Sequence, residues 1–174
     1  MPDHSAPVSV PYLHTRRLTL REYRLSDFDA FAAHLADPQT MTFLGAPIDR
    51  RNAWRIFGVN TGGWMLQGAG WWAVEQRDTG ALVGNVGAFF RETWPEIELG
   101  WNTFRAFWGQ GLASEAASEV LRYVLEVRKE RRATALIDPG NASSLRVAAH
   151  LGMTYESDAD LFGERVGRFV KAGT

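Results

Sequence analysis

Cysteine is absent from the 174 residues of the chain. This absence excludes disulfide bonds, thiolate nucleophiles and thiolate ligands for metal ions. Neither His-Glu-x-x-His nor Gly-x-Ser-x-Gly occurs, and the histidines do not stand at metal-ligand spacing. We therefore expect neither a metal site nor a covalent acyl-enzyme intermediate.

Long apolar runs and an excess of one charge are also lacking. No stretch approaches about 18 apolar residues, so the sequence predicts no membrane span. The net charge of −1 favours neither nucleic acid nor an anionic membrane as a partner. Residues 1–12 show the features of neither a signal peptide nor an anchor, and we expect a flexible leader before a single domain over residues 13–174. A cytoplasmic location is the default expectation, and a homodimer is one oligomeric state left open.

Aromatic residues, by contrast, are plentiful. The chain has seven tryptophans and ten phenylalanines, and 45% of its residues are hydrophobic. Because aromatic side chains bury large areas, a chain of this length can form one firm core without covalent cross-links.

Helical periodicity begins soon after the leader. A first helix, with Ser26 and Asp29 in the positions of a capping box, should end at Asp37-Pro38. A second helix should begin at Asp49 and end at Gly62-Gly63. Helical spacing returns in two later segments, Ser114–Val127 and Asn141–His150.

Strand-like segments occupy most of the remainder. They are Leu18–Tyr23, Trp71–Glu75, Leu82–Phe89, Glu96–Trp101, Ala133–Ile137 and two closing strands marked by Tyr155 and Phe169–Val170. The order is strand, two helices, three strands, helix, strand, helix, two strands. It predicts an α/β (α+β) fold with a mixed, mostly antiparallel twisted sheet of about six to seven strands flanked by about four helices.

The sharpest local feature is the segment Phe107–Glu115, which lies between a predicted strand and a strong helix. A glycine-rich turn at a helix start exposes backbone N–H groups at the positive end of the helix dipole. Such a turn binds phosphate or pyrophosphate. A tight turn followed by a helix cap is the plain alternative.

Three nucleotide motifs compete for this segment. A Walker loop requires lysine where Ala113 stands. The dinucleotide fingerprint is matched by Gly109, Gly111 and Ser114, but it should open a domain and here follows about 100 residues. The third candidate is the pyrophosphate loop of acetyl-CoA enzymes.

Three segments resemble one known family. The run from Glu98–Trp101 through Trp108–Ala116 is similar to the acetyl-CoA motif of the GNAT superfamily, closest to the RimJ/RimL-type N-terminal acetyltransferases. Thr15–Arg21 resembles the first strand of that branch, and Asn141–Met153 resembles its late Asn-x-x-Ser signature. The resemblance spans nearly the whole chain. It implies a GNAT-like fold and direct transfer of acetyl from acetyl-CoA to a primary amine, either a protein N-terminus or a small molecule, in a ternary complex.

The resemblance also implies where the cofactor binds. The pyrophosphate would lie on backbone N–H groups of the glycine-rich loop, pantetheine along the strand Glu96–Trp101, and Asn141 on the far side of the arm. Simple helix capping is an equal alternative for Asn141. The implied cofactor-binding residues are Leu99, Gly100, Trp101, Trp108, Gly109, Gln110, Gly111, Leu112, Ala113, Ser114, Asn141 and Ser144.

Acetyl transfer requires a deprotonated amine and benefits from a proton donor to the leaving thiolate. Glu98 lies beside the expected thioester and is the candidate base, directly or through water, with Glu96 in reserve; a solvated strand carboxylate is the alternative. Many superfamily members carry a tyrosine at the position of Ala148. Its absence makes Ser144, which the resemblance marks, the candidate acid, against the alternative of an ordinary serine in a first helical turn. Tyr155 is the next donor to test.

Two classes of function remain open at this point. Glu98 and Ser144 favour an enzyme over a non-catalytic acyl-CoA-binding sensor or interaction module, because binding alone requires neither residue. The acidic residues Asp158, Asp160 and Glu164 could attract a cationic amine, although a solvated loop is the favoured interpretation.

Overall fold

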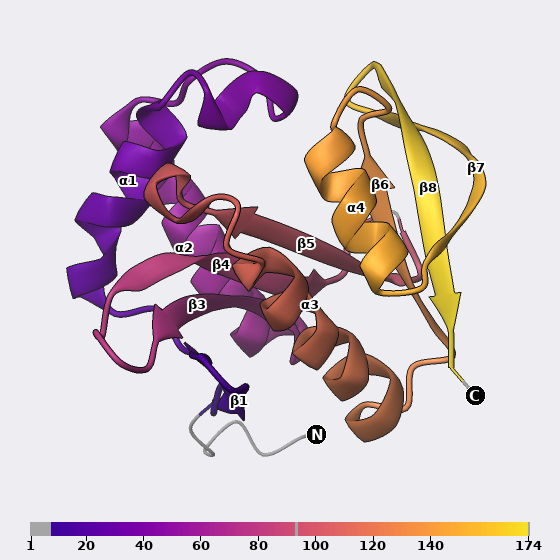
Figure 1. Cartoon of the computed structure of the whole chain (residues 1–174), viewed down its shortest axis with the longest axis horizontal. Helices are drawn as coiled ribbons and strands as arrows, with labels where there is room; N and C mark the ends of the chain where they lie inside the picture. The colour runs from indigo at the N-terminus through magenta and orange to yellow at the C-terminus, as the bar shows by residue number, and fades with distance from the viewer. Residues whose placement is uncertain (1–7, 93, 174) are drawn as a thin grey trace.

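The chain forms one mixed sheet with helices on both faces (Figure 1). The computed structural model describes residues 8–92 and 94–173. In this part of the chain the sheet has eight strands in the order β1-β2-β3-β4-β5-β6-β8-β7. The strands are β1 (Leu13–His14), β2 (Leu18–Arg21), β3 (Gly70–Gln76), β4 (Leu82–Phe89), β5 (Ile97–Thr103), β6 (Arg132–Ile137), β7 (Thr154–Leu161) and β8 (Glu164–Ala172).

Four α-helices and several short helical turns connect these strands. The helices are α1 (Phe28–Ala36), α2 (Arg50–Gln67), α3 (Leu112–Arg122) and α4 (Ala142–His150). The 3₁₀ turns are η1 (Leu25–Asp27), η2 (Thr40–Phe43) and η3 (Arg105–Phe107), and a π-helical turn, η4 (Tyr123–Val127), extends α3. The predicted mixed, mostly antiparallel fold is confirmed. Strand β1 was not predicted, because its two residues are too few to show an alternating pattern. None of the described helices combines the length and apolar character needed to cross a membrane.

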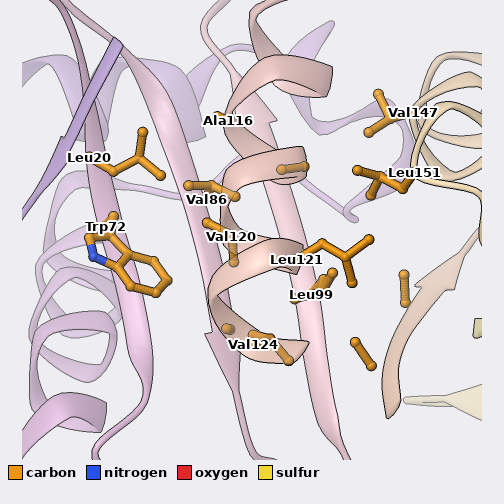
Figure 2. Packing of buried hydrophobic residues seen from close by; sticks show 14 of the residues in the cluster. Leu20, Trp72, Val86, Leu99, Ala116, Val120, Leu121, Val124, Val147 and Leu151 are labelled. Carbon is orange, nitrogen blue, oxygen red and sulfur yellow. The ribbon is translucent and has the colours of Figure 1, made fainter. Parts of the chain in front are cut away.

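The two faces of the sheet carry separate apolar clusters. Trp72 belongs to the larger cluster beneath α3 and α4, whereas its neighbour Ala73 belongs to the cluster beneath α1 and α2. This division follows from the alternation of side chains along a strand. In the larger cluster, Val120 and Leu121 of α3 lie close to the strands, and Leu151, directly after α4, faces Leu121 (Figure 2).

The start of α1 differs from the prediction. The capping contact lies one turn earlier, at η1: the Asp27 carboxylate accepts a hydrogen bond at 2.8 Å from the backbone N–H of Arg24, the N-cap of η1. Among the described residues, no side chain caps α1 itself. The Asp27 carboxylate also accepts two hydrogen bonds from the buried Arg21, at 2.8 and 2.9 Å. The predicted capping box of Ser26 and Asp29 is therefore wrong, because the buried Arg21–Asp27 ion pair and the Arg24–Asp27 hydrogen bond fix the η1 turn that precedes α1.

The end of α2 also differs. The helix continues through Gly62-Gly63 and ends at Gly68, which has a left-handed φ of 61°. Trp64, only 4% exposed, packs edge-on against Trp72 at 4.5 Å, and this burial outweighs the helix-breaking tendency of glycine. A Cβ on Gly63 would lie 2.8 Å from the Ala69 carbonyl oxygen. The glycine therefore permits a close approach rather than ending the helix.

The predicted leader, residues 1–12, falls partly outside the described residues, which begin at residue 8. Its last part is held against the domain. The Pro11 carbonyl accepts a hydrogen bond from Trp72 Nε1 at 2.7 Å, and the Tyr12 hydroxyl donates to Glu22 at 2.8 Å.

The feature that positions the site is a divergence between β5 and β6. These parallel strands pair at Ile97 with Ala133 and at Glu98 with Thr134. Beyond Glu98, β5 continues to pair with β4 and β6 with β8, so the two strands separate toward their carboxyl ends (Figure 1). Within the described part of the chain, the edge of β5 from Leu99 to Thr103 thus has no partner on β6. We call this the β5–β6 divergence.

Candidate active site

The glycine-rich loop enters α3 in a conformation that suits an anion site. Gly109 and Gly111 have φ values of 75° and 74°, a left-handed region that side chains disfavour. The first helical bond of α3 runs from Glu115 N–H to the Gly111 carbonyl. The three preceding N–H groups, of residues 112–114, therefore lack intrahelical acceptors and point out at the positive helix end. Trp108 anchors the loop by donating from Nε1 to the Thr103 carbonyl at 2.7 Å.

A hollow of about 670 Å³ lies beside this helix end, a volume in the range of ligand sites. Its lining residues are Thr15, Gly111, Ser114, Glu115, Ser118, Glu119, Arg122 and His150. They come from α3, from the C-terminal end of α4 and from the segment before β2.

One carboxylate joins the N-terminal segment to the loop. Glu115 accepts hydrogen bonds from the Thr15 hydroxyl at 2.6 Å and from the backbone N–H and Nε of Arg17 at 2.9 and 2.6 Å. Burial opposes the charged form, but these hydrogen bonds outweigh it and lower the pKa of Glu115. The structure thus places two of the segments that carry the family resemblance side by side.

Residues of β5 and α4 face each other across the β5–β6 divergence. Trp101 Nε1 donates a hydrogen bond to Ser144 Oγ at 3.3 Å. The Asn141 side-chain oxygen accepts from the Ser144 N–H at 3.0 Å and caps α4. Capping therefore accounts for this oxygen of Asn141, and a ligand contact would use its Nδ2 group.

Glu98 lies on the opposite face of β5 from Leu99, which is buried under α3. Its side chain is only 6% exposed and accepts two hydrogen bonds from Arg91, Nε to Oε2 at 2.5 Å and Nη2 to Oε1 at 2.8 Å. This bidentate pair raises the pKa of Arg91, so the guanidinium stays charged.

Glu96 occupies a different environment. It forms ion pairs with Arg132, at 2.8 Å, and with Arg168. Arg132 also donates a hydrogen bond to Glu156 at 2.8 Å. Glu96 directly precedes β5 and Arg132 begins β6, so their ion pair lies at the joined end of the two strands. Arg168 reaches Glu96 from β8, where it pairs with Leu136.

Tyr155 and the acidic residues predicted near it belong to the β7–β8 hairpin. The Tyr155 hydroxyl donates to Asp158 at 3.0 Å, and Asp158 also pairs with Arg165. Asp160 accepts from the Gly163 N–H at 3.1 Å in the hairpin turn. Tyr155 lines a second hollow, of about 430 Å³, between this hairpin and α4. Asp158 and Asp160 thus serve local contacts, but they lie on β7, and Glu164 begins β8, so the predicted loop is wrong: the segment is a paired hairpin.

A family model described as an acetyltransferase (GNAT) domain matches residues 17–154, well over half of the chain. The chain belongs to the GNAT acetyltransferase family. It is accordingly an acetyltransferase enzyme rather than a non-catalytic binding module, and its cofactor is acetyl-CoA.

Individual relatives agree with this membership. The uncharacterized protein YkkB of Bacillus subtilis (strain 168) is 35% identical over 121 residues, which cover 68% of this chain and 70% of that protein. The crystal structure of an acetyltransferase from Agrobacterium tumefaciens str. C58 superposes with a TM-score of 0.85 at 29% identity, covering 97% of this chain and 98% of that one. A Vibrio cholerae structure described as a putative ribosomal-protein-serine acetyltransferase has the same fold, with a TM-score of 0.78 at 21% identity and coverage of 95% and 99%.

The geometry of this acetyltransferase fits acetyl-CoA. A Cβ on Gly109 would meet nothing within 4 Å, so space for a ligand lies against the loop backbone. The free N–H groups at the start of α3 suit a pyrophosphate. The exposed backbone edge of β5 offers hydrogen bonds to the amide groups of a pantetheine arm.

The partner of Glu98 was not predicted from the sequence. Arg91 follows β4 in a loop without a recognisable motif, and no pattern in the sequence marks it. The pairing of Phe89 with Glu98 across β4 and β5 is what brings the two side chains together.

Proposed function

We propose that this acetyltransferase moves acetyl from acetyl-CoA directly to a primary amine in a ternary complex. The acceptor is a protein N-terminal α-amine or a small-molecule amine. The observation that supports this most is the β5–β6 divergence, which begins beyond Glu98 and has Ser144 and Trp101 in contact across it. The motif resemblance and the shared fold of the Vibrio cholerae protein support the RimJ/RimL-type branch. A cytoplasmic location and a homodimer stay predictions.

The cofactor-binding part of the proposal rests on backbone groups. The N–H groups of Gly109–Ser114 would hold the pyrophosphate, with Trp108 fixing the loop. The backbone of Leu99–Trp101 and the Nδ2 group of Asn141 would hold the arm on its two sides. Two observations support this assignment: the N–H groups at the start of α3 lack intrahelical acceptors, and β5 has no β6 partner beyond Glu98 in the described part of the chain.

Ser144 is the proposed proton donor. Bound acetyl-CoA supplies an acetyl group activated as a thioester, whose leaving group is a thiolate. Because Ser144 Oγ accepts a hydrogen bond from Trp101 Nε1, its own hydrogen must point elsewhere. Acceptance from the indole also polarises the hydroxyl and favours release of its proton to sulfur. Trp101 is thus a positioning residue for Ser144.

Glu98 is the proposed base for the amine. Each of its oxygens accepts one bond from Arg91, and a carboxylate oxygen has a second lone-pair position. Its small exposure favours removal of the amine proton through a bridging water rather than by direct contact.

Thermal unfolding with and without acetyl-CoA tests the cofactor assignment. At about 100 times its dissociation constant, a ligand that binds only the folded chain adds roughly 2.7 kcal/mol to the free energy of unfolding. We expect this stabilisation with CoA and acetyl-CoA and much less with NAD or ATP. Stabilisation by NAD without stabilisation by CoA would contradict the proposal.

A side chain at Gly111 should abolish cofactor binding. In Gly111→Val, the branched side chain occupies the hollow beside α3, and its left-handed backbone costs about 1–2 kcal/mol of stability. Gly80→Val is the matched control, because Gly80 has a φ of 70° and open surroundings in the β3–β4 turn. Both variants should lose similar stability. Calorimetric titration should show a loss of CoA affinity of more than about tenfold in Gly111→Val alone, and equal affinities would mean that the loop is only a turn.

A further inference from the structure

The acceptor must approach from the face of the sheet that carries Glu98, if the proposed function holds. The α3 loop and Leu99 lie on one face of β5, and Glu98 and Gly100 lie on the other. An arm that starts at α3 and enters the β5–β6 divergence directs its far end toward this second face. The side chains around Glu98 and Gly100 therefore decide which amines are accepted.

An aromatic wall borders this position. A Cβ placed on Gly87 or on Gly100 would lie 2.5 Å from the Trp71 ring, so the indole lies flat over both glycines. Phe89 stacks on Trp71 with ring centroids 5.2 Å apart and planes 21° apart. Aromatic faces beside a buried carboxylate are the usual elements of a site for organic cations.

The side chain of Arg91 occupies the position beside Phe89 and Glu98 where an organic cation would bind. The Arg91 guanidinium lies 5.5 Å from the Phe89 ring centroid and 5.8 Å from that of Phe162, at the tip of the β7–β8 hairpin. Its pair with Glu98 neutralises the carboxylate at the wall. Glu96, on the same strand face, is neutralised by other arginines. Among the described residues, the Glu98 and Glu96 carboxylates are thus both already paired with arginines.

Arg91 remains able to bind a further anion. An arginine side chain has five N–H donors, of which Glu98 accepts two. The side chain is 30% exposed, so it is accessible from solvent. A charged, partly exposed guanidinium with unused N–H donors binds carboxylates strongly and with defined geometry.

We propose that Arg91 is a specificity-determining residue that binds a carboxylate of the acceptor. The acceptor class is then a small amino acid-like amine, with a carboxylate several bonds from the amine. Polyamines and other purely cationic amines are disfavoured, because they would place positive charge against the guanidinium.

Matched acceptor pairs test this assignment with the full chain. 4-Aminobutanoate and 6-aminohexanoate are compared with their amides, in which the remote carboxylate is neutral and the amine is little changed. We expect wild-type kcat/KM to favour the acids about 10- to 100-fold, as loss of a charge-assisted hydrogen bond would predict. In Arg91→Met this preference should fall to about one, with the KM for acetyl-CoA unchanged.

Arg91→Met leaves Glu98 buried and unpaired, which can prevent folding, so a second variant is needed as a control. Arg91→Lys keeps a cation beside Glu98 but loses the planar fork, so it should fold and show an intermediate preference. A preference that survives both substitutions overturns the inference.

The wild-type results separate the inference from the proposed function. If the enzyme acetylates spermidine, the amides or a peptide N-terminus at least as fast as the acids, the inference fails while amine acetylation stands. If acetyl-CoA stabilises the fold but no amine of either kind is acetylated, both fail. Faster acetylation of spermidine by Arg91→Met than by wild type would show that Arg91 excludes a cation rather than recognising an anion, and would also overturn the inference.

Discussion

Ser144→Ala is expected to lower kcat and kcat/KM together by about 10²–10⁴-fold, the usual contribution of general acid catalysis. The hydroxyl is small, and its proton matters chiefly when the C–S bond breaks. The dissociation constant of acetyl-CoA, measured by titration calorimetry, should therefore stay nearly unchanged. Pre-steady-state rates of thiol release would locate the defect in the chemical step.

Two further variants sharpen this test. Ser143→Ala removes the neighbouring hydroxyl, which is exposed and accepts a hydrogen bond from Arg146, and should be as active as the wild type. Trp101→Phe keeps an aromatic ring but removes the N–H that orients Ser144, so it should show a smaller loss of kcat. Full activity of Ser144→Ala at every pH would assign the donor role elsewhere, and Tyr155 would be the next residue to substitute.

Glu98→Gln should show a defect that depends on pH. A base is needed only while the amine is protonated, so the loss should be about 10²–10⁴-fold near neutral pH. It should shrink as pH rises toward the pKa of the amine, about 8 for an α-amine and about 10.4 for a lysine-type amine. Profiles of kcat/KM against pH for wild type and variant measure this directly.

The neighbouring strand glutamate provides the control. Glu96→Gln removes a carboxylate that is held by Arg132 and Arg168, away from the β5–β6 divergence, and should leave the pH profile unchanged. Glu98→Gln also leaves Arg91 without its charged partner, so the melting temperature of this variant should fall. The melting temperature must therefore be measured together with the rates. A loss that is the same at all pH values would assign Glu98 a structural role in place of the base.

Locally determined features were predicted well. Gly109 and Gly111 stand at a helix start, where only glycine adopts a left-handed φ without strain, and the structure has both there. Gly152, just after α4, likewise has a left-handed φ, of 67°. Such features depend on a few neighbouring residues, so the sequence pattern contains the information.

Features that depend on distant partners were missed. Gly62-Gly63 indicated a helix end. The helix continues because burial of the Trp64 side chain against Trp72 of β3 stabilises it by more than the two glycines destabilise it. The Asp27 carboxylate binds the buried Arg21 and caps η1 rather than α1, and Arg91 reaches Glu98 through a register set by two strands. Composition and periodicity contain no information on these pairings between distant residues. The family resemblance marks Glu98 but not its partner.

The short ladder between β5 and β6 has a mechanical consequence. Two residue pairs, reinforced by the Thr134 hydroxyl donating to the Ile97 carbonyl at 3.2 Å, join the two halves of the sheet directly. A change in the angle between β5 and β6 would therefore be centred on these two pairs. At about 3.3 Å per residue, β5 extends about 16 Å from Glu98 to Thr103. A rotation of about 5° centred there moves Thr103 by roughly 1.4 Å, while Glu98 hardly moves. The width of the β5–β6 divergence at Thr103 can thus change while the backbone at Glu98, the proposed base, stays paired with β6.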